Sequence, residues 1–537
     1  MALTKAHNRM IEGSGVTFAD FGATGLGDET SAIQAALTYA STNGIPIVDY
    51  SNKTYTYSAN LNVGAIEMYG NFTLAATGTA YLQIAGTITE IGYVNATTTA
   101  GDKSITLSTT SGLSADDVII IWNSTTSSFS AHRVDYYDGE FSRVLSVSGS
   151  DANLETTLIS SYSAAATNKV YKISGIKVII DGPSFTGSGA YVVRVLYADG
   201  AVLRPTLIQS SATEGSAITV DRCYNTFIDS GKYIIPYTSG MGLGYGISLS
   251  NCQYANITNI DSFGGRHAIA TGGDNQDGAA PCRFITIQNS VLANDPASNV
   301  YCADFHGNTA DSKYSNCTIY GAVGLGGERV SIEDCKVYGL PDSANPILGY
   351  QELVGGQLLF KNIKCYLAEG STATSVIGNL SSTFVNNINK PYQVEVDNVD
   401  ASINSNVTSF INAYESSGQA SVWIANQIGF RGTISGLTTI FAFTKAGSGI
   451  DPSFIRISDL NFQLIDNYSL ITVSGTTLSG VDLYLPTLVS NNPPTSGYYL
   501  QNTIVTRQPA TAGTSIGWVC TASGSPGTWK SFGTIAS

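Results

Sequence analysis

Residues 16–37 read VTFADFGATGLGDETSAIQAAL, and this stretch decides the expected fold. Val16 and Phe18 alternate with neighbouring residues as in a short strand. Glycines at positions 22, 25 and 27 then interrupt the pattern. The residues therefore predict a strand that ends in a glycine-rich turn.

A helix is predicted over residues 30–42. Asp28 and Thr30 are good N-cap residues, and apolar side chains then recur at helical spacing. Gly44 supplies the expected end of the helix. The order is thus a strand, a glycine turn and an amphipathic helix.

The amino-acid sequence of this stretch resembles that of a known family. DFGA at residues 20–23, GDET at 27–30 and AIQAA at 32–36 are similar to the start of bacteriophage tailspikes with a pectate-lyase-like β-helix. The resemblance implies an all-β fold, namely a right-handed parallel β-helix, or solenoid, with an N-terminal capping helix and a small β insertion domain.

Composition agrees with an all-β chain and limits its partners. Of the 537 residues only 12% are charged, while 56 are glycine and 30 are tyrosine, a mixture that favours short strands and turns. The net charge of −14 argues against a nucleic-acid partner, because phosphate binding requires clustered Lys and Arg. The negative net charge also repels an acidic polysaccharide at long range, so arginines and hydrogen bonds would have to hold such a ligand locally.

The sequence predicts neither membrane insertion nor a secretory signal. No apolar run approaches the ~18 residues that span a bilayer, and the N-terminus lacks a signal-peptide core. All eight cysteines occur from Cys223 onward, several of them after Asn or Asp. They are expected to be reduced and buried at repeated coil positions, and no cofactor or metal is expected.

The chain divides into five predicted parts. The resemblance to tailspikes suggests a neck for attachment to the phage tail or baseplate, the β-helix start with its capping helix, a small β insertion domain, the main parallel β-helix, and a C-terminal β module. These parts are assigned to residues 1–15, 16–94, 95–172, 173–490 and 491–537.

Short aliphatic runs recur through the predicted β-helix. Each places two apolar residues around one polar residue, often before Asn or Asp, as stacked coils with inward aliphatics require. The runs are residues 218–220, 247–249, 285–287, 330–332, 394–396 and 455–457. Their unequal spacing predicts unequal loops, where binding grooves form.

The candidate site lies where two of the four histidines, His267 and His306, fall within 40 residues of each other. The strand period of two places Asp304 and His306 on one face and Ala303 and Phe305 on the other. If Phe305 faces the core, the acid and the imidazole face solvent. The predicted catalytic residues are Asp304, Asp274, Glu328 and His306, and the predicted substrate-binding residues are Arg266, His267, Arg329, Tyr301 and Tyr245.

These residue types suit two reactions. Glycoside hydrolysis needs a proton donor and a second carboxylate, which Asp304 with Asp274 or Glu328 would supply. A lyase would instead use a histidine to remove the proton next to a uronate, with Arg266 or Arg329 neutralising the carboxylate. The hydrolase is the preferred interpretation.

Structural roles remain open for the same residues. Arg266 and Arg329 would then pair with Asp261, Glu333 or Asp334 across adjacent coils, and Asp274 would be a turn residue. A calcium site at Asp274 and Asp277 is an alternative without a recognisable loop motif.

In the insertion, His132, Arg133, Tyr137 and Glu140 are expected to belong to a structural hairpin rather than to contact glycan. Trp518 and Trp529 are expected to pack a small C-terminal module or a trimer seam rather than to stack on sugars.

The leading hypothesis, implied by the resemblance, is a homotrimeric phage tailspike. Such a protein is made in the host cytoplasm, forms part of the virion, and binds and cuts a bacterial surface polysaccharide. One alternative is a non-catalytic glycan-binding tail fibre with a stacking surface that includes Tyr233 and Tyr301. Another is a free bacterial pectate-lyase-like enzyme, which the missing secretion signal disfavours.

Overall fold

The computed structural model describes residues 15–537 except for the segments that follow: 213–214, 238–243, 299, 341–344, 369–370, 380–389, 391, 403–406, 416–420, 432–438, 446–450, 459–460, 463–468, 476–477, 479–480, 485–487, 496–498, 500 and 525. The predicted neck therefore lies almost entirely outside the described residues. The chain forms two compact units, Met1–Thr318 and Ile319–Ser537. The fold is the predicted right-handed parallel β-helix.

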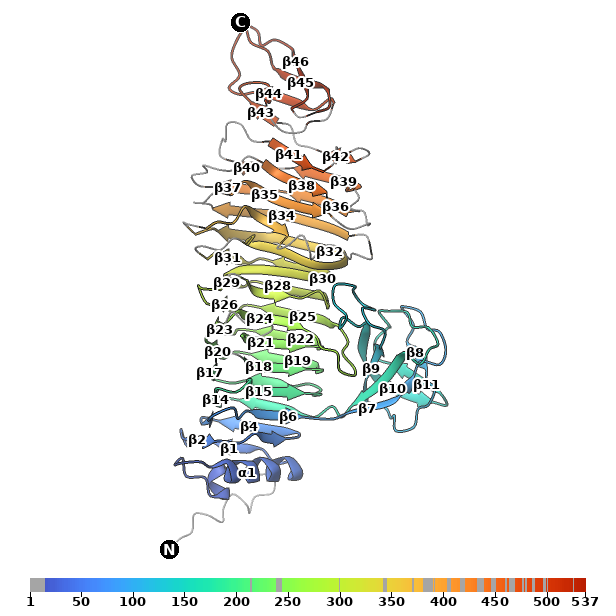
Figure 1. The fold of residues 1–537 in the computed structure, drawn as a ribbon, viewed down its shortest axis with the longest axis vertical. Coiled ribbons are helices and arrows are strands. Elements are labelled where there is room, and N and C mark those ends of the chain that lie inside the picture. Colours follow the sequence, from blue (N-terminus) through green and yellow to red (C-terminus); the bar gives the residue numbers. More distant parts are fainter. Residues whose placement is uncertain are drawn as a thin grey trace. The chain divides into compact units, whose positions relative to one another are not determined.

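The first unit stacks its strands in three parallel columns (Figure 1). One column contains β1 (Ile47–Asp49), β4 (Ile66–Gly70), β13 (Val178–Asp181), β16 (Val202–Arg204), β19 (Tyr224–Asp229), β22 (Gln253–Thr258), β25 (Cys282–Gln288) and β28 (Thr309–Ser315). The second contains β2 (Thr54–Tyr57), β5 (Thr73–Ala76), β14 (Ser184–Gly187), β17 (Leu207–Ser210), β20 (Lys232–Ile235), β23 (Asp261–Gly264) and β26 (Val291–Ala293). The third contains β3 (Leu61–Val63), β6 (Leu82–Ala85), β15 (Tyr191–Leu196), β18 (Ser216–Asp221), β21 (Tyr245–Ser250), β24 (His267–Gly272) and β27 (Tyr301–Phe305).

The second unit repeats this arrangement. Its longest column contains β30 (Ala322–Glu333), β32 (Leu348–Tyr366), β34 (Tyr392–Ser402), β36 (Ser421–Asn426), β39 (Phe454–Ser458) and β42 (Asp482–Tyr484). Further parallel strands are β31 (Lys336–Tyr338), β33 (Ser375–Asn379), β35 (Ser409–Glu415), β37 (Gly429–Arg431), β38 (Thr439–Lys445), β40 (Asn461–Phe462) and β41 (Ser469–Ser474). A separate sheet contains β43 (Leu488–Ser490), β44 (Ile504–Arg507), β45 (Gly517–Ala522) and β46 (Thr528–Phe532), and β29 (Thr318–Tyr320) spans the boundary between the units.

The predicted aliphatic runs all lie in strands of these columns, and their apolar residues form the core. The Asn residues that follow many runs occupy left-handed backbone, with φ near 52° at both Asn289 and Asn316. Asn tolerates this conformation better than most residues. The Asn316 side chain also donates to Asn289 Oδ1 at 2.7 Å, which links consecutive coils. The eight cysteines are buried free thiols, as predicted.

The N-terminal end differs in detail from the prediction. Val16 forms only an isolated bridge to Ile47, and η2 (Phe18–Phe21) is a single 3-10 turn rather than part of a strand. The capping helix α1 (Thr30–Asn43) lies across the end of the stacked strands. Its N-cap residue is Glu29, not Asp28 or Thr30, and Asp28 instead accepts hydrogen bonds from Thr30.

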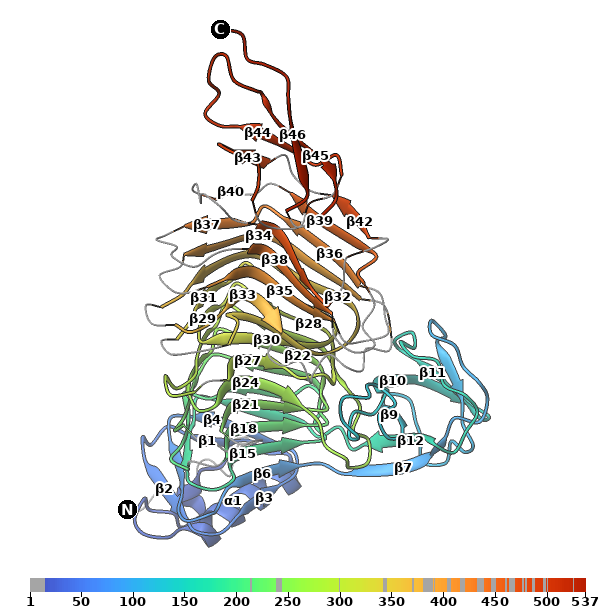
Figure 2. The same ribbon diagram turned by 45° about the horizontal axis from the view of Figure 1, so that its top comes forward.

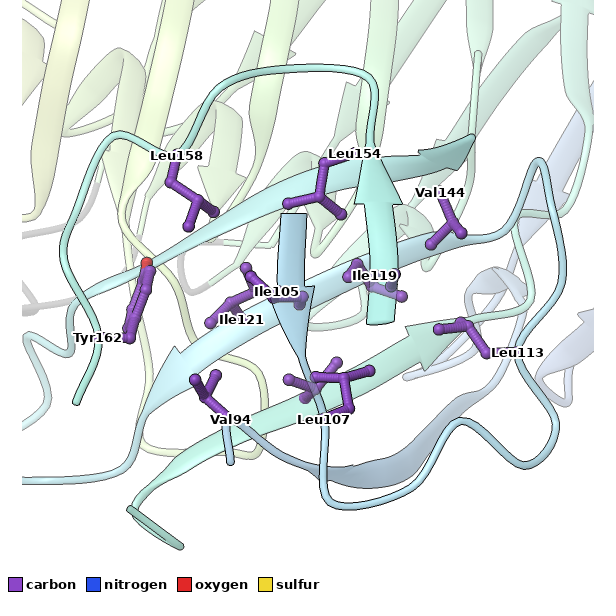
Figure 3. Packing of buried hydrophobic residues seen from close by; sticks show 12 residues of the cluster. Val94, Ile105, Leu107, Leu113, Ile119, Ile121, Val144, Leu154, Leu158 and Tyr162 are labelled. Atoms are coloured by element: carbon purple, nitrogen blue, oxygen red, sulfur yellow. The ribbon is translucent and has the colours of Figure 1, made fainter. Parts of the chain in front are cut away.

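The insertion forms an antiparallel sheet between β6 and β13 (Figure 2). Its strands are β7 (Ile88–Tyr93), β8 (Ser104–Thr106), β9 (Val118–Asn123), β10 (Gly139–Ser148), β11 (Asp151–Leu154) and β12 (Asn168–Ile173). Alternate residues of β9 face two different cores. Ile119 and Ile121 point into the insertion's own core (Figure 3). Ile120 and Trp122 belong to a cluster that includes Tyr224 of the β-helix, so the insertion is packed against the coils.

Candidate functional site

The site is built from adjacent strands of one column in the first unit. Tyr245 of β21 is in register with His267 of β24, and Ala270 of β24 is in register with Asp304 of β27. His306 follows the end of β27 directly. Because coils are stacked one strand spacing apart, ~4.8 Å, residues that lie far apart in sequence meet here.

Asp304 is the centre of the cluster. Its Oδ2 lies 3.0 Å from His306 Nε2 and 3.8 Å from His267 Nδ1. The two imidazole rings meet edge to face, with centroids 6.1 Å apart. The structure therefore brings together three of the predicted site residues.

Two more predicted residues complete this cluster. The Tyr245 ring stacks on His267 with centroids 5.2 Å apart and an interplanar angle of 6°. Arg266 Nη1 donates a long hydrogen bond of 3.5 Å to the Tyr245 hydroxyl. The cluster thus offers a carboxylate, two imidazoles, a phenol and a guanidinium.

The expected exposure of Asp304 is wrong. Ala303 and Phe305 do face the core, where Phe305 stacks on Tyr314 at 4.2 Å. Asp304 is nevertheless only 3% exposed, since every residue of β27 is buried. The strand period predicts the direction of a side chain but not what covers it. His306, whose side chain is 13% exposed, is the member of the Asp304–His306 pair that reaches the surface.

Burial and neighbouring charges together set the protonation of His267 and Asp304. Burial lowers the pKa of His267 to about 3, although the Asp304 charge acts in the opposite direction. Burial also favours the neutral acid form of Asp304, but the charge and hydrogen bond of His306 outweigh it and hold the Asp304 pKa below its ordinary value. At neutral pH the site therefore contains an ionised carboxylate beside a neutral His267, and Asp304 is poorly suited to donate a proton.

Tyr301 has a supporting position rather than a surface one. The Nδ1–H of His267 donates to the carbonyl oxygen of Tyr301 at 2.5 Å, which fixes the ring. The Tyr301 side chain is 1% exposed, and Tyr233 is also fully buried. The stacking surface of the tail-fibre alternative therefore lacks these two residues.

Asp274 contacts a different cation. It is ion-paired with Arg222, whose buried guanidinium also lies 2.6 Å from Asp221. Arg222 Nε donates to the carbonyl oxygen of Asp277 at 2.9 Å. These contacts hold the loop after β24. The structural partner of Asp274 is thus Arg222, in place of the calcium ion considered as an alternative.

Glu328 and Arg329 lie on β30 of the second unit. Glu328 is buried, is ion-paired with Arg329, and accepts from Lys390 Nζ at 2.9 Å. Arg329 is thus paired with an acid, but the acid is the adjacent Glu328 rather than the expected Asp261, Glu333 or Asp334 of neighbouring coils. Whether Glu328 acts together with Asp304 stays a prediction.

Arg133 of the insertion, for which the sequence favours a structural role over a glycan contact, acts electrostatically on Tyr245. Burial raises the pKa of the Tyr245 hydroxyl, while the positive charges of Arg266 and Arg133 act in the opposite direction. Arg133 is exposed in the β9–β10 loop, more than 100 residues from Tyr245 in sequence, so no local pattern could have connected them. Thr271 was also missed; its hydroxyl accepts from the His306 amide at 3.1 Å.

Other candidate sugar contacts have structural roles, as expected. Glu140 is buried and accepts from the amides of Ile159 and Ser160. Trp122 packs on Tyr137 edge to face. In the C-terminal sheet Trp518 is buried, and the Arg507 guanidinium lies over its ring in a cation–π contact. Trp529 packs on Tyr499 and donates to a backbone carbonyl.

Two family models match parts of the chain. Residues 213–441 match a model described as Gp49, pectin lyase-like, and residues 83–173 match one described as tailspike protein-like, Ig-like domain. These matches confirm the resemblance to phage tailspikes with a pectate-lyase-like β-helix. No curated protein matches. Among the described residues, no helix is long and apolar enough to cross a membrane.

Solved structures agree on the fold. The tailspike gp49 of Pseudomonas phage LKA1 is 24% identical with a TM-score of 0.74, and the match covers 86% of this chain and 83% of that one. The tailspike gp61 of Pseudomonas phage phi297 is 17% identical with a TM-score of 0.73 over 97% of both chains. The gp54 tailspike of Acinetobacter baumannii bacteriophage AP22, solved with a capsular saccharide, is 16% identical with a TM-score of 0.61, over 93% of this chain and 80% of that one. At these identities the likeness establishes the architecture alone.

Proposed function

We propose that this chain is a phage tailspike that binds a bacterial surface polysaccharide and depolymerises it at the Asp304 cluster. The family matches and the β-helix support the tailspike assignment. One tailspike of similar fold has been solved with a capsular saccharide, which supports a glycan of the same general class as the substrate here.

The observation that carries the proposal is the Asp304–His306 pair. A buried, ionised carboxylate 3.0 Å from a histidine that reaches the surface is an arrangement for moving a proton at a bound substrate. In a hydrolase, Asp304 acts on water or on the anomeric carbon, and a second carboxyl group donates the proton, a role for which Asp274 of the same unit would have to leave its ion pair with Arg222.

A lyase is the second candidate, and the charge state of Asp304 favours it. An ionised Asp304 orients His306 as a base that removes the proton next to a uronate. Arg266 then neutralises the uronate carboxylate beside Tyr245. The glycan in this case is acidic, and local arginine contacts offset the repulsion from the chain's net charge of −14.

The test is to incubate the protein with a panel of capsules and O-antigens and to measure product size. Asp304→Asn keeps the shape and removes the charge, so cleavage should fall ~10²- to 10⁴-fold while folding is retained. Asp261→Asn, at the half-buried start of β23, is the matched control and should retain activity. Wild-type turnover by Asp304→Asn on a verified substrate rejects the assignment.

The same digest separates the two reactions. A lyase leaves a double bond conjugated with the uronate carboxylate, which absorbs ultraviolet light, whereas a hydrolase adds water and leaves no such group. The homotrimer, the attachment of the N-terminus to the phage tail, and synthesis in the host cytoplasm belong to the same proposal. Light scattering that finds a monomer at micromolar concentration counts against the trimer.

A further inference from the structure

We propose that His267, Asp304 and His306 bind a first-row divalent metal ion such as Zn²⁺. The inference concerns the same three side chains as the proposed function but does not depend on cleavage. Metal binding is a separate property, measurable without any polysaccharide.

The spacing of the side chains suits a single ion. One ligand atom from each residue lies within 4.8 Å of the other two. Nitrogen and oxygen ligands sit about 2.0–2.2 Å from zinc, so two ligands of one ion lie roughly 3–3.5 Å apart. The separation of 3.0 Å between Asp304 Oδ2 and His306 Nε2 falls within this range. The 3.8 Å between Asp304 Oδ2 and His267 Nδ1 lies outside it, so the His267 ring would have to shift for its other nitrogen, Nε2, to share the ion.

The tautomer of His267 leaves one of its ring nitrogens able to bind a metal ion. A carbonyl oxygen only accepts hydrogen bonds, so the contact of 2.5 Å with Tyr301 assigns the ring proton to Nδ1. Nε2 then has a free lone pair. It is buried and has no hydrogen-bond partner within the described part of the chain. Metal-binding histidines characteristically donate their other N–H to a backbone carbonyl in this way.

The donor set indicates which metal. Two imidazoles and one carboxylate suit zinc and other first-row transition ions, whereas calcium and magnesium prefer oxygen ligands. Three protein ligands leave at least one coordination position open, as in catalytic rather than structural zinc sites. An ion there would add positive charge near Arg266 and Tyr245, where an acidic sugar is proposed to bind.

The experiment uses the full-length, tag-free protein after treatment with a chelator. Calorimetric titration with ZnCl₂ should show one saturable site per chain, and titration with CaCl₂ should not. Co²⁺ should bind the same site and give the visible absorption of a low-coordinate nitrogen and oxygen complex. Absence of both zinc binding and the cobalt spectrum in folded wild-type protein overturns the proposal.

Variants locate the site. His306→Gln and Asp304→Asn should weaken zinc binding at least as much as the about 10–100-fold losses typical of outer-shell changes. His132→Gln in the insertion is the matched control and should bind as the wild type does. Equal loss in His132→Gln, or full binding by His306→Gln and Asp304→Asn, refutes the assignment without relying on the fully buried His267. Cleavage by a protein that binds no zinc would leave the proposed function intact, and zinc binding without cleavage of any glycan would count against the function alone.

Discussion

Gln253 joins the insertion to the β-helix, and its replacement by Ala should loosen that connection. Gln253 is fully buried on β22. Its Oε1 accepts from the Phe141 amide at 2.9 Å, and its Nε2 donates to the carbonyl oxygen of Pro281 at 3.0 Å. Gln253→Ala removes both partners at once and leaves a donor and an acceptor buried without them.

The size of the effect follows from these contacts. A buried polar group without a partner costs about 1–3 kcal/mol. The free energy that protects the Phe141 amide from exchange should fall by this amount. Since about 1.4 kcal/mol is a factor of ten, hydrogen exchange at Phe141 should accelerate roughly 5- to 150-fold. The orphaned Phe141 amide should weaken the docking of the insertion by about 1–3 kcal/mol, whereas the orphaned Pro281 carbonyl lies within the β-helix itself.

Hydrogen–deuterium exchange read by mass spectrometry over residues 139–144 measures this directly. Gln288→Ala is the control, because Gln288 is only half-buried on the neighbouring β25 and makes one weak side-chain contact of 3.5 Å. Exchange in Gln253→Ala that equals the wild-type rate would refute the reasoning that this side chain holds the insertion.

Three further outcomes are expected. Burial alone would raise the pKa of Glu29, but hydrogen bonds from Thr24 and Gly25 outweigh it and lower the pKa below its ordinary 4.5. The stability that the ionised Glu29 contributes is therefore present above pH 4.5 and is lost as the pH falls through the lowered pKa. In Glu29→Gln, the protection of α1 from hydrogen exchange should depend less on pH than in the wild type. Leu37→Ala should cost about 2–5 kcal/mol because Leu37 is on the buried face of α1, whereas Leu26→Ala, at a side chain 81% exposed, should change thermal inactivation little. Arg266→Gln should raise KM for an acidic polysaccharide more than it lowers kcat, and an unchanged KM in steady-state kinetics would argue against a substrate-binding role.

Much of the fold could be predicted because inward aliphatic side chains repeat along the chain. The run at residues 285–287 predicts β25, since two buried isoleucines around one polar residue satisfy the strand period. The same logic failed at Phe18, whose burial comes from packing on Tyr55 and Phe72 rather than from a strand. In the sequence, an apolar residue buried in a turn cannot be distinguished from one buried in a strand.

The site could be predicted only in part. The Asp-x-His spacing placed Asp304 and His306 together correctly, because both belong to one short segment. The partner of Asp274 is Arg222, which lies 52 residues away in the chain. Such pairs depend on coil lengths and on the insertion, and these are set by tertiary packing rather than by any local pattern.

The insertion leaves and rejoins the β-helix at one point. The Thr87 amide donates to Ser174 Oγ at 2.8 Å, and β4 is paired directly with β13 as though the intervening residues were absent. The pairing of β4 with β13 therefore does not depend on which domain lies between Thr87 and Ser174. A different domain could be grafted between Thr87 and Ser174 without shifting the register of any strand, provided that it presents a matching apolar face to Tyr224. Exchange of such a domain would change the surface beside these coils while the β-helix scaffold stays the same.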